Sequence, residues 1–298
     1  MAHSLSPSRK LCLAIAALVL LAGAGVSARE EKADPAATRE YAVAAGLQGK
    51  GLYTLATARW QRFIETYPKD ARLSNAYHHL GACQLHDKQP AKAAQTFRTL
   101  IEKFPKSASL DAAQFNLGLA LYNVGLASQK ADDLRTAARA FADVPTRFPK
   151  SKRVASALYY QGECLYRAGD LPGAVVLYRK VIAEHPASDI VPDVYYALGT
   201  AQQEAGQDKD AATTYRLFLD KYPKSASLDA AQFNLGLALY NVGLASQKAD
   251  DLRTAARAFA DVPTRFPKSK RVASALYYQG ECLYRAGDLL GPSSSTAR

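Results

Sequence analysis

The sequence predicts an all-α protein, a right-handed superhelix of about six helical hairpins followed by a partial last one. Three observations predict this architecture. An aromatic residue or a histidine followed by proline recurs along the chain at intervals of 37 or 44 residues. A glycine lies thirteen residues after each of these prolines, and a serine or aspartate lies two residues after it. Alanine, leucine and tyrosine are plentiful while β-branched runs are few, which favours helices over strands.

Each recurring unit has the features of two helices and a turn. The proline ends one helix because it has no N–H to donate. The serine or aspartate is a good N-cap for the next helix. The second helix carries a small residue twelve positions before the following proline and a large apolar residue eight before it, as in Ala93 and Phe97. We expect the glycine and the alanine to let the two helices approach while the aromatic ring fills the angle between them. The prolines are Pro68, Pro105, Pro149, Pro186, Pro223 and Pro267, and the glycines are Gly81, Gly118, Gly162, Gly199, Gly236 and Gly280.

The first 28 residues have the pattern of a secretory signal peptide. A basic start at Arg9 and Lys10 precedes an apolar segment over residues 11–24, and small residues at Val26 and Ala28 suit a cleavage site after Ala28. An uncleaved anchor is the alternative. No later stretch has the length and apolarity of a membrane span. The sequence therefore predicts an exported protein, periplasmic or secreted, without stable membrane insertion after processing.

The hairpins are expected in order along residues 37–289, after a short linker at 29–36. The first unit is degenerate, with Gly46, Ala56 and Trp60 as its markers. Two longer units carry seven extra residues, around 128–133 and 246–251, which we expect to lengthen the hairpin loop. Residues 290–298 are predicted to be a disordered tail. The expected repeats span about 37–69, 72–106, 109–150, 153–187, 190–224, 227–268 and, for the partial one, 271–289.

One long segment of the chain occurs twice. Residues 105–171 recur without a single change as residues 223–289. Either a very recent duplication or a chimeric sequence assembly would produce this identity. The last hairpin lacks its second helix, so its helix is expected to expose an apolar face. That face offers a surface for homo-oligomerisation, because natural solenoids usually cover it with a polar capping helix.

The run from Asn75 to Gly81, followed by Ala93 and Phe97, resembles the tetratricopeptide repeat consensus, and the match recurs over residues 37–289. The longer repeat is similar to bacterial envelope members of this family, the class of the Tol–Pal accessory protein and the outer-membrane assembly lipoprotein. Two features depart from those proteins. Cys12 lies inside the apolar segment rather than in a lipid-attachment motif, and too few residues precede the first helix for a coiled coil. The resemblance implies a non-enzymatic scaffold or adaptor that binds another protein or peptide. The alternative is a regulatory subunit of an envelope enzyme complex that builds peptidoglycan or assembles the outer membrane.

The resemblance also implies where a partner binds. In this family the first helix of each hairpin lines a concave groove, and aromatic side chains at those positions suit peptide capture because rigid rings lose little entropy on binding. The alternative is that the rings pack against the neighbouring repeat. The lysine and asparagine that clamp a terminal carboxylate in chaperone-binding members are absent. The predicted groove residues are His78, His86, Phe115, Tyr122, Asn123, Tyr159, Glu163, Tyr166, Arg167, Tyr196, Phe233, Tyr240, Asn241, Tyr277, Tyr284 and Arg285.

Other chemistries are not expected from this sequence. It has no phosphate-binding loop and no hydrolase or metalloprotease motif, so we predict no enzymatic activity, no cofactor and no metal. The net charge of +11 comes from scattered basic residues, and export argues against nucleic acid as a partner. His78 and His86 lie about 12 Å apart along a helix, too far for one metal ion. Cys83, Cys164 and Cys282 occupy equivalent repeat positions and are expected to be small core residues.

Overall fold

The structure, a computed structural model, describes residues 34–288 of the chain. This range holds thirteen α-helices and no strand, which confirms the all-α prediction. The expected signal peptide and the tail over 290–298 lie outside the described residues, as does most of the expected linker. The helices are α2 (Pro35–Gly49), α3 (Tyr53–Thr66), α4 (Leu73–His86), α5 (Pro90–Lys103), α6 (Leu110–Ser128), α7 (Ala131–Arg147), α8 (Val154–Arg167), α9 (Leu171–Glu184), α10 (Val191–Glu204), α11 (Asp208–Lys221), α12 (Leu228–Ser246), α13 (Ala249–Arg265) and α14 (Val272–Arg285).

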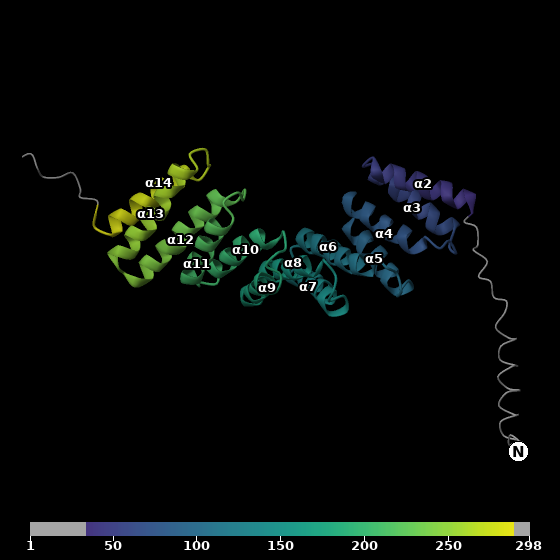
Figure 1. The fold of residues 1–298 in the computed structure, drawn as a ribbon, viewed down its shortest axis with the longest axis horizontal. Helices are drawn as coiled ribbons and strands as arrows, with labels where there is room; N and C mark the ends of the chain where they lie inside the picture. Colours follow the sequence, from purple (N-terminus) through teal and green to yellow (C-terminus); the bar gives the residue numbers. More distant parts are fainter. Residues whose placement is uncertain (1–33, 289–298) are drawn as a thin grey trace, which may run out of the picture.

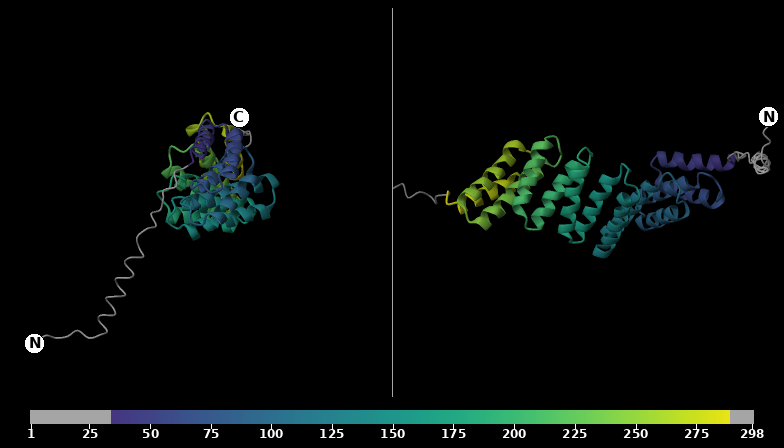
Figure 2. Two further views of the ribbon diagram at one scale, coloured as in Figure 1. Left: turned by 90° about the vertical axis from the view of Figure 1, so that its right-hand side faces the viewer. Right: turned by 60° about the horizontal axis from the view of Figure 1, so that its bottom comes forward.

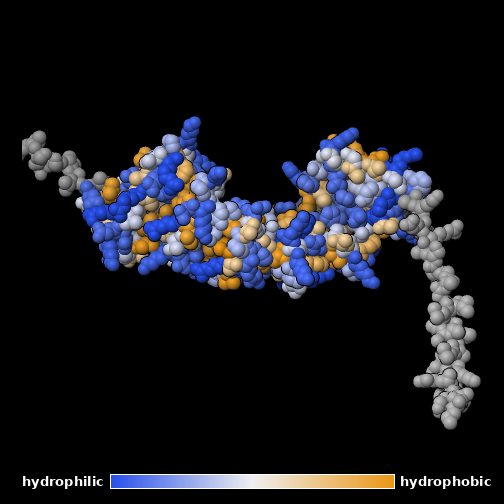
Figure 3. Space-filling view, in the orientation of Figure 1, coloured by the Kyte–Doolittle hydropathy of each residue, from blue (hydrophilic) through white to orange (hydrophobic). Residues whose placement is uncertain are grey.

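The helices form one continuous superhelical array. Each helix packs against the one before it and the one after it, so the chain is a row of hairpins (Figures 1 and 2). The row curves, and helices α6, α8 and α10 lie along the floor of the hollow between its two raised ends (Figure 1). The space-filling view shows the same hollow as a broad saddle (Figure 3). The first helix of each central hairpin thus faces the concave side, with the second helix behind it.

Glycine and an aromatic ring form the joint of each hairpin, as the sequence predicts. A Cβ atom built on Gly81 would lie 2.6 Å from the ring of Phe97, and one on Gly162 would lie 2.6 Å from the ring of Tyr178. The same close approach occurs at Gly118, Gly199 and Gly236. These positions admit no side chain because the ring already fills the space. The rings are fully buried and belong to Phe97, Phe141, Tyr178, Tyr215 and Phe259.

The seven extra residues of the longer units extend the helices, so the prediction of a lengthened loop is wrong. Helices α6 and α12 have 19 residues and α7 and α13 have 17, whereas the helices of the shorter units have 14 or, in α2, 15. The connection in the first long unit is only Gln129 and Lys130, with Gln129 in the left-handed region at φ 56°. Gly125 does not break α6. It lets Leu134 of α7 approach to 2.9 Å of where a Cβ would lie, so the extended helices stay packed.

At five of the six joints the serine or aspartate after the proline caps a turn before the helix rather than the helix itself. Asp70 Oδ1 accepts the N–H of Arg72 at 2.8 Å, and Ser151 Oγ accepts the N–H of Arg153 at 3.1 Å. Helices α4 and α8 begin after these turns, at Leu73 and Val154. The predicted N-cap position is therefore wrong by two residues, because the N-caps of α4 and α8 are Arg72 and Arg153. The cause is a preceding hydrogen-bonded turn, in which the carbonyl oxygen of Asp70 accepts the N–H of Leu73 at 3.0 Å.

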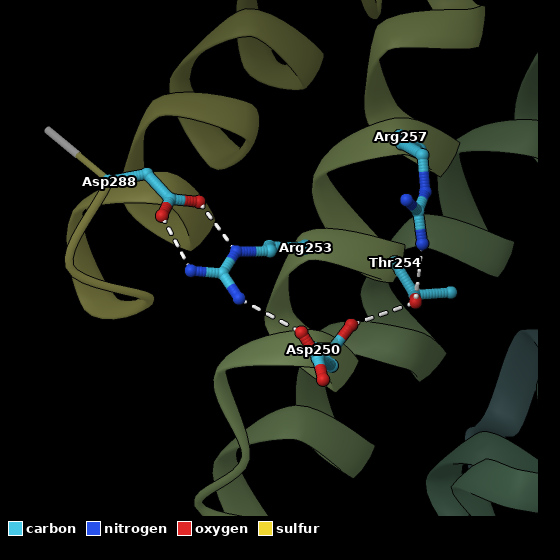
Figure 4. A network of polar contacts seen from close by, with 5 residues as sticks. All are labelled: Asp250, Arg253, Thr254, Arg257 and Asp288. Carbon is cyan, nitrogen blue, oxygen red and sulfur yellow. Dashed lines mark hydrogen bonds and ion pairs between the residues drawn. The ribbon is translucent and has the colours of Figure 1, made fainter.

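The last residue but one of the duplicated segment is an aspartate that has different partners in its two copies. Asp170 accepts the N–H of Gly173 at 3.0 Å and so caps α9. Its counterpart Asp288 accepts two hydrogen bonds from Arg253, at 2.9 and 2.7 Å (Figure 4). Arg253 also donates to Asp250 at 2.9 Å. The last described residue is thereby tied to α13 in the absence of a following described helix.

Three cysteines lie at equivalent places in the described array. Cys83, Cys164 and Cys282 are fully buried and form no disulfide. Burial raises the pKa of the thiols to about 11 for Cys83 and Cys282 and to about 12 for Cys164. They pack as small core residues. Between residues 34 and 288 no helix combines the length and the apolar character that crossing a membrane requires.

Candidate partner-binding face

The predicted groove residues lie on the first helices of the hairpins, but their side chains differ in solvent exposure. His86, Asn123, Arg167, Tyr277, Tyr284 and Arg285 are exposed. The others are half-buried, namely His78, Phe115, Tyr122, Tyr159, Glu163, Tyr166, Tyr196, Phe233, Tyr240 and Asn241. The half-buried group divides further into side chains that pack inside the array and side chains that border open space.

Two of the predicted aromatic residues pack between helices. The ring of Phe115 lies 5.6 Å from that of Phe141 and 5.9 Å from that of Tyr160, edge to face in both cases. Phe233, its counterpart in the second copy, packs in the same way against Phe259 at 5.6 Å. These two phenylalanines contribute to the core, which is the alternative that the sequence left open for such rings.

The two predicted histidines are placed apart and have different surroundings. Burial lowers the pKa of His78, and the neighbouring His79 lowers it further. A ring nitrogen of His78 lies 3.4 Å from the side-chain nitrogen of Asn116 on α6. His86 is exposed and stacks on Tyr53 with ring centroids 4.3 Å apart. No group of three or more potential metal ligands occurs in the described part of the chain.

Four of the predicted residues meet in one pocket, between α8, α9 and α10. The pocket has a volume of about 260 Å³. One wall is a stripe of α8, where Tyr159, Glu163 and Tyr166 lie four and three residues apart and therefore on one helical face. The opposite wall is the matching stripe of α10, which includes Asp193 and Tyr196.

The floor of this pocket is Tyr178 of α9, and its hydroxyl holds the acidic side chain in place. Tyr178 is fully buried and donates a hydrogen bond to Glu163 Oε1 at 2.6 Å. At the rim, the Tyr166 hydroxyl donates to Glu204, which bridges α8 and α10. The ring of Tyr159 packs 6.0 Å from that of Tyr178. The pocket is thus built from rings whose orientations are fixed by contacts with each other and with carboxylates.

The pocket is acidic although the protein as a whole is basic. Glu163 and Asp193 line it, and no lysine or arginine does. Burial raises the pKa of Tyr159, and the charges of Glu163 and Asp193 raise it further. Arg167 pairs with one of these carboxylates. Its Nε lies 3.9 Å from Glu163 Oε2 while its guanidinium lies 5.9 Å from the ring centroid of Tyr122 on α6. Arg167 is therefore shared with the neighbouring hairpin and neutralises the pocket only in part.

The second copy of the segment repeats α8 as α14 but does not repeat the pocket. Tyr277 and Tyr284, the counterparts of Tyr159 and Tyr166, are 68% and 67% exposed. The position of Tyr178 has no counterpart after α14 within the described residues, and a Cβ on Gly280 would meet nothing within 4 Å. Glu281 instead pairs with Arg285 of the same helix at 2.6 Å. The same α8 sequence therefore forms a pocket wall only where α9 and α10 follow it.

Besides Ala197, sequence reasoning missed three residues of the pocket, Tyr178, Asp193 and Thr200. Tyr178 is the ring at a hairpin joint, so its position indicated only core packing. Helical spacing could have found the other two, because Asp193 and Thr200 lie three residues before and four after Tyr196 on one face of α10.

Comparisons with known proteins agree with this architecture. Residues 75–107 and 112–151 match a sequence model of the tetratricopeptide repeat, and residues 152–277 match that of an outer membrane lipoprotein family, YfiO. No curated protein matches the chain by sequence.

Solved structures similar to the chain share its fold. PilW, described as a widely conserved type IV pilus biogenesis factor, is 17% identical with a TM-score of 0.56, over 82% of this chain and 100% of PilW. PilF of Pseudomonas aeruginosa is 16% identical with a TM-score of 0.53, over 83% and 97% of the two chains. A tetratricopeptide repeat protein of Parabacteroides merdae is 10% identical with a TM-score of 0.56, over 83% and 100%.

Proposed function

Since this chain is a tetratricopeptide repeat protein that matches an outer membrane lipoprotein family over residues 152–277, we propose that it is a non-enzymatic adaptor of the bacterial cell envelope. It holds a segment of another protein on its concave face. Repeat proteins of this kind typically bind other proteins on such extended concave surfaces. The observation that carries the proposal is the tyrosine-lined pocket between α8 and α10, two of the helices that lie along the floor of the hollow (Figure 1).

The size of the binding contribution follows from the rings. Burying one large aromatic side chain is worth roughly 1.5–3 kcal/mol. Three or four such rings, less the cost of association, support an affinity of about micromolar. The half-buried tyrosines already have restricted rotamers, which lowers the entropy lost on binding.

Affinity capture from an envelope extract tests this function. The protein should retain a partner that is lost from a variant with Tyr122, Tyr159 and Tyr166 changed to Ala, because the central rings are removed. The matching variant of the second copy, with Tyr240, Tyr277 and Tyr284 changed to Ala, shows how far along the array the partner extends. Far-UV circular dichroism must show that both variants stay helical. Equal capture by all three proteins would contradict a concave site. A peptidoglycan or outer-membrane assembly enzyme as the captured protein would assign the regulatory role instead of the scaffold.

A second candidate function is self-association through α14. Leu158 of α8 is 2% exposed, whereas its identical counterpart Leu276 of α14 is 51% exposed beside Tyr277. We propose that two copies of the chain cover this face by packing α14 against α14. Sedimentation velocity at rising concentration should then show a dimer that Leu276→Ser with Tyr277→Ser converts to a monomer. A monomeric mass for the unmodified protein at the highest concentration would rule this association out.

A further inference from the structure

Resting on the proposed function, we infer that the pocket between α8 and α10 selects a cationic side chain of the partner, arginine above lysine. The pocket combines two carboxylates with the rings of several tyrosines, and none of its lining residues is basic. Its volume of about 260 Å³ accommodates one long side chain and not a helix. An adaptor with this pocket would require a basic residue at one position of the segment that it binds.

The carboxylates supply the charge recognition. Glu163 comes from α8 and Asp193 from α10, so a cation between the two helices has an acidic group on either side. The Tyr178 hydroxyl fixes Glu163 from below through its 2.6 Å hydrogen bond. A carboxylate that is already oriented loses little freedom when it binds a cation, which is the condition under which such pairs contribute to affinity. Asp193 is exposed and forms no ion pair with any residue between 34 and 288.

The tyrosine rings favour the same ligand. A guanidinium or ammonium group within about 6 Å of an aromatic ring centroid is attracted by its π electrons. The chain already uses this contact nearby, because the Arg167 guanidinium lies 5.9 Å from the ring centroid of Tyr122. The planar guanidinium can stack on a ring while it donates hydrogen bonds to a carboxylate, which a lysine ammonium cannot do in the same way. Arginine is therefore the preferred occupant.

The duplicated segment provides a matched control. Glu281 has the same helix sequence around it as Glu163, but it lies on α14, where it pairs with Arg285 and where no described residue replaces Tyr178 or Asp193. Glu163→Gln and Glu281→Gln therefore remove the same charge from the same local sequence. Only the first change removes it from the pocket.

The experiment selects peptides from a phage-displayed random dodecapeptide library on the full chain and measures their affinities by fluorescence anisotropy. We expect the selected peptides to share an arginine or lysine at one position. Replacing that residue by citrulline or norleucine should weaken binding about tenfold. Glu163→Gln and Asp193→Asn should weaken the basic peptide by a similar factor and leave the neutral peptide unaffected, while Glu281→Gln leaves both affinities unchanged.

Two other outcomes separate the failure of this inference from that of the adaptor function. Peptides that bind and lose affinity with Tyr159→Ala, but tolerate citrulline at every basic position, would overturn the cation preference and leave the concave site in place. Equal weakening by Glu163→Gln and Glu281→Gln would do the same, because it would point to overall charge. The absence of any selected peptide that binds would overturn both proposals.

Discussion

Changing Phe259 to Ala is expected to open the C-terminal end of the array, whereas the same change at Phe141 is not expected to open the middle. Both rings are fully buried, and each stacks on a tyrosine, Phe141 on Tyr160 at 5.5 Å and Phe259 on Tyr278 at 5.3 Å. Truncating a buried phenylalanine costs about 3–5 kcal/mol, so the local loss is the same at the two sites. The outcome differs because an internal hairpin is held by neighbours on both sides, while α12 to α14 have a neighbouring hairpin on one side only within the described array.

Hydrogen exchange read by mass spectrometry measures this difference. Most peptides from residues 105–171 and 223–289 are identical in mass, but the substitution itself distinguishes the mutated copy of α7 or α13 from its unmutated twin. Phe259→Ala should make the α13 peptide exchange fast while the α7 peptide stays protected. Phe141→Ala should leave both protected. Fast exchange of the mutated peptide in both variants would show that contacts between hairpins contribute little.

Gly162→Ala is expected to destabilise the protein, and Gly280→Ala to stabilise it, although the two glycines lie in identical stretches of sequence. A methyl group on Gly162 would lie 2.6 Å from the Tyr178 ring, which is buried and cannot move aside. Such overpacking costs about 1–3 kcal/mol. A methyl group on Gly280 meets nothing within 4 Å, and alanine is favoured over glycine in a helix by about 1 kcal/mol.

Urea unfolding followed by circular dichroism compares the two variants with the unmodified protein. The midpoint should fall for Gly162→Ala and should rise for Gly280→Ala. A double variant is the control. Tyr178→Ala removes the ring that the new methyl group would meet, so the loss of unfolding free energy in Gly162→Ala with Tyr178→Ala should be smaller than the sum of the two separate losses. A fall of the same size for both glycine variants would mean that the glycine is required for the helix itself and not for the ring.

Much of this fold could be predicted from the sequence because its signal is periodic and local. The glycine and the aromatic ring of each hairpin recur at fixed positions, so the contact of Gly81 with Phe97 follows from their spacing in the repeat. The lengthened helices could not be located as easily. Gly125 and the polar run over 128–133 have the composition of a loop, but α6 continues to Ser128, and Leu134 of α7 packs against Gly125.

The pocket was only partly predictable for a different reason. Tyr159, Glu163, Tyr166 and Tyr196 follow from helical spacing within α8 and α10 together with the family resemblance. The role of Tyr178 depends on the position of its hydroxyl, which reaches Glu163 from a ring buried in the core. The angle between α8 and α9 sets that position. Residue spacing within one repeat does not give that angle. The difference between α8 and α14 has the same origin, because identical residues acquire their environment from the helices that follow.

The three buried thiols can report how often each part of the array opens. Cys83 lies in α4, Cys164 in α8 and Cys282 in α14, so one thiol sits near each end of the described array and one near its middle. A thiol-specific reagent can reach each sulfur only when its own hairpin opens. Cleavage after glutamate separates Cys164 from Cys282, because the peptides that begin after Glu163 and Glu281 extend into the sequences that differ after residues 171 and 289. The labelling rate of each cysteine therefore reports how often its own part of the array opens. Fraying at the ends of the described array can thus be compared with opening at its centre without an engineered cysteine.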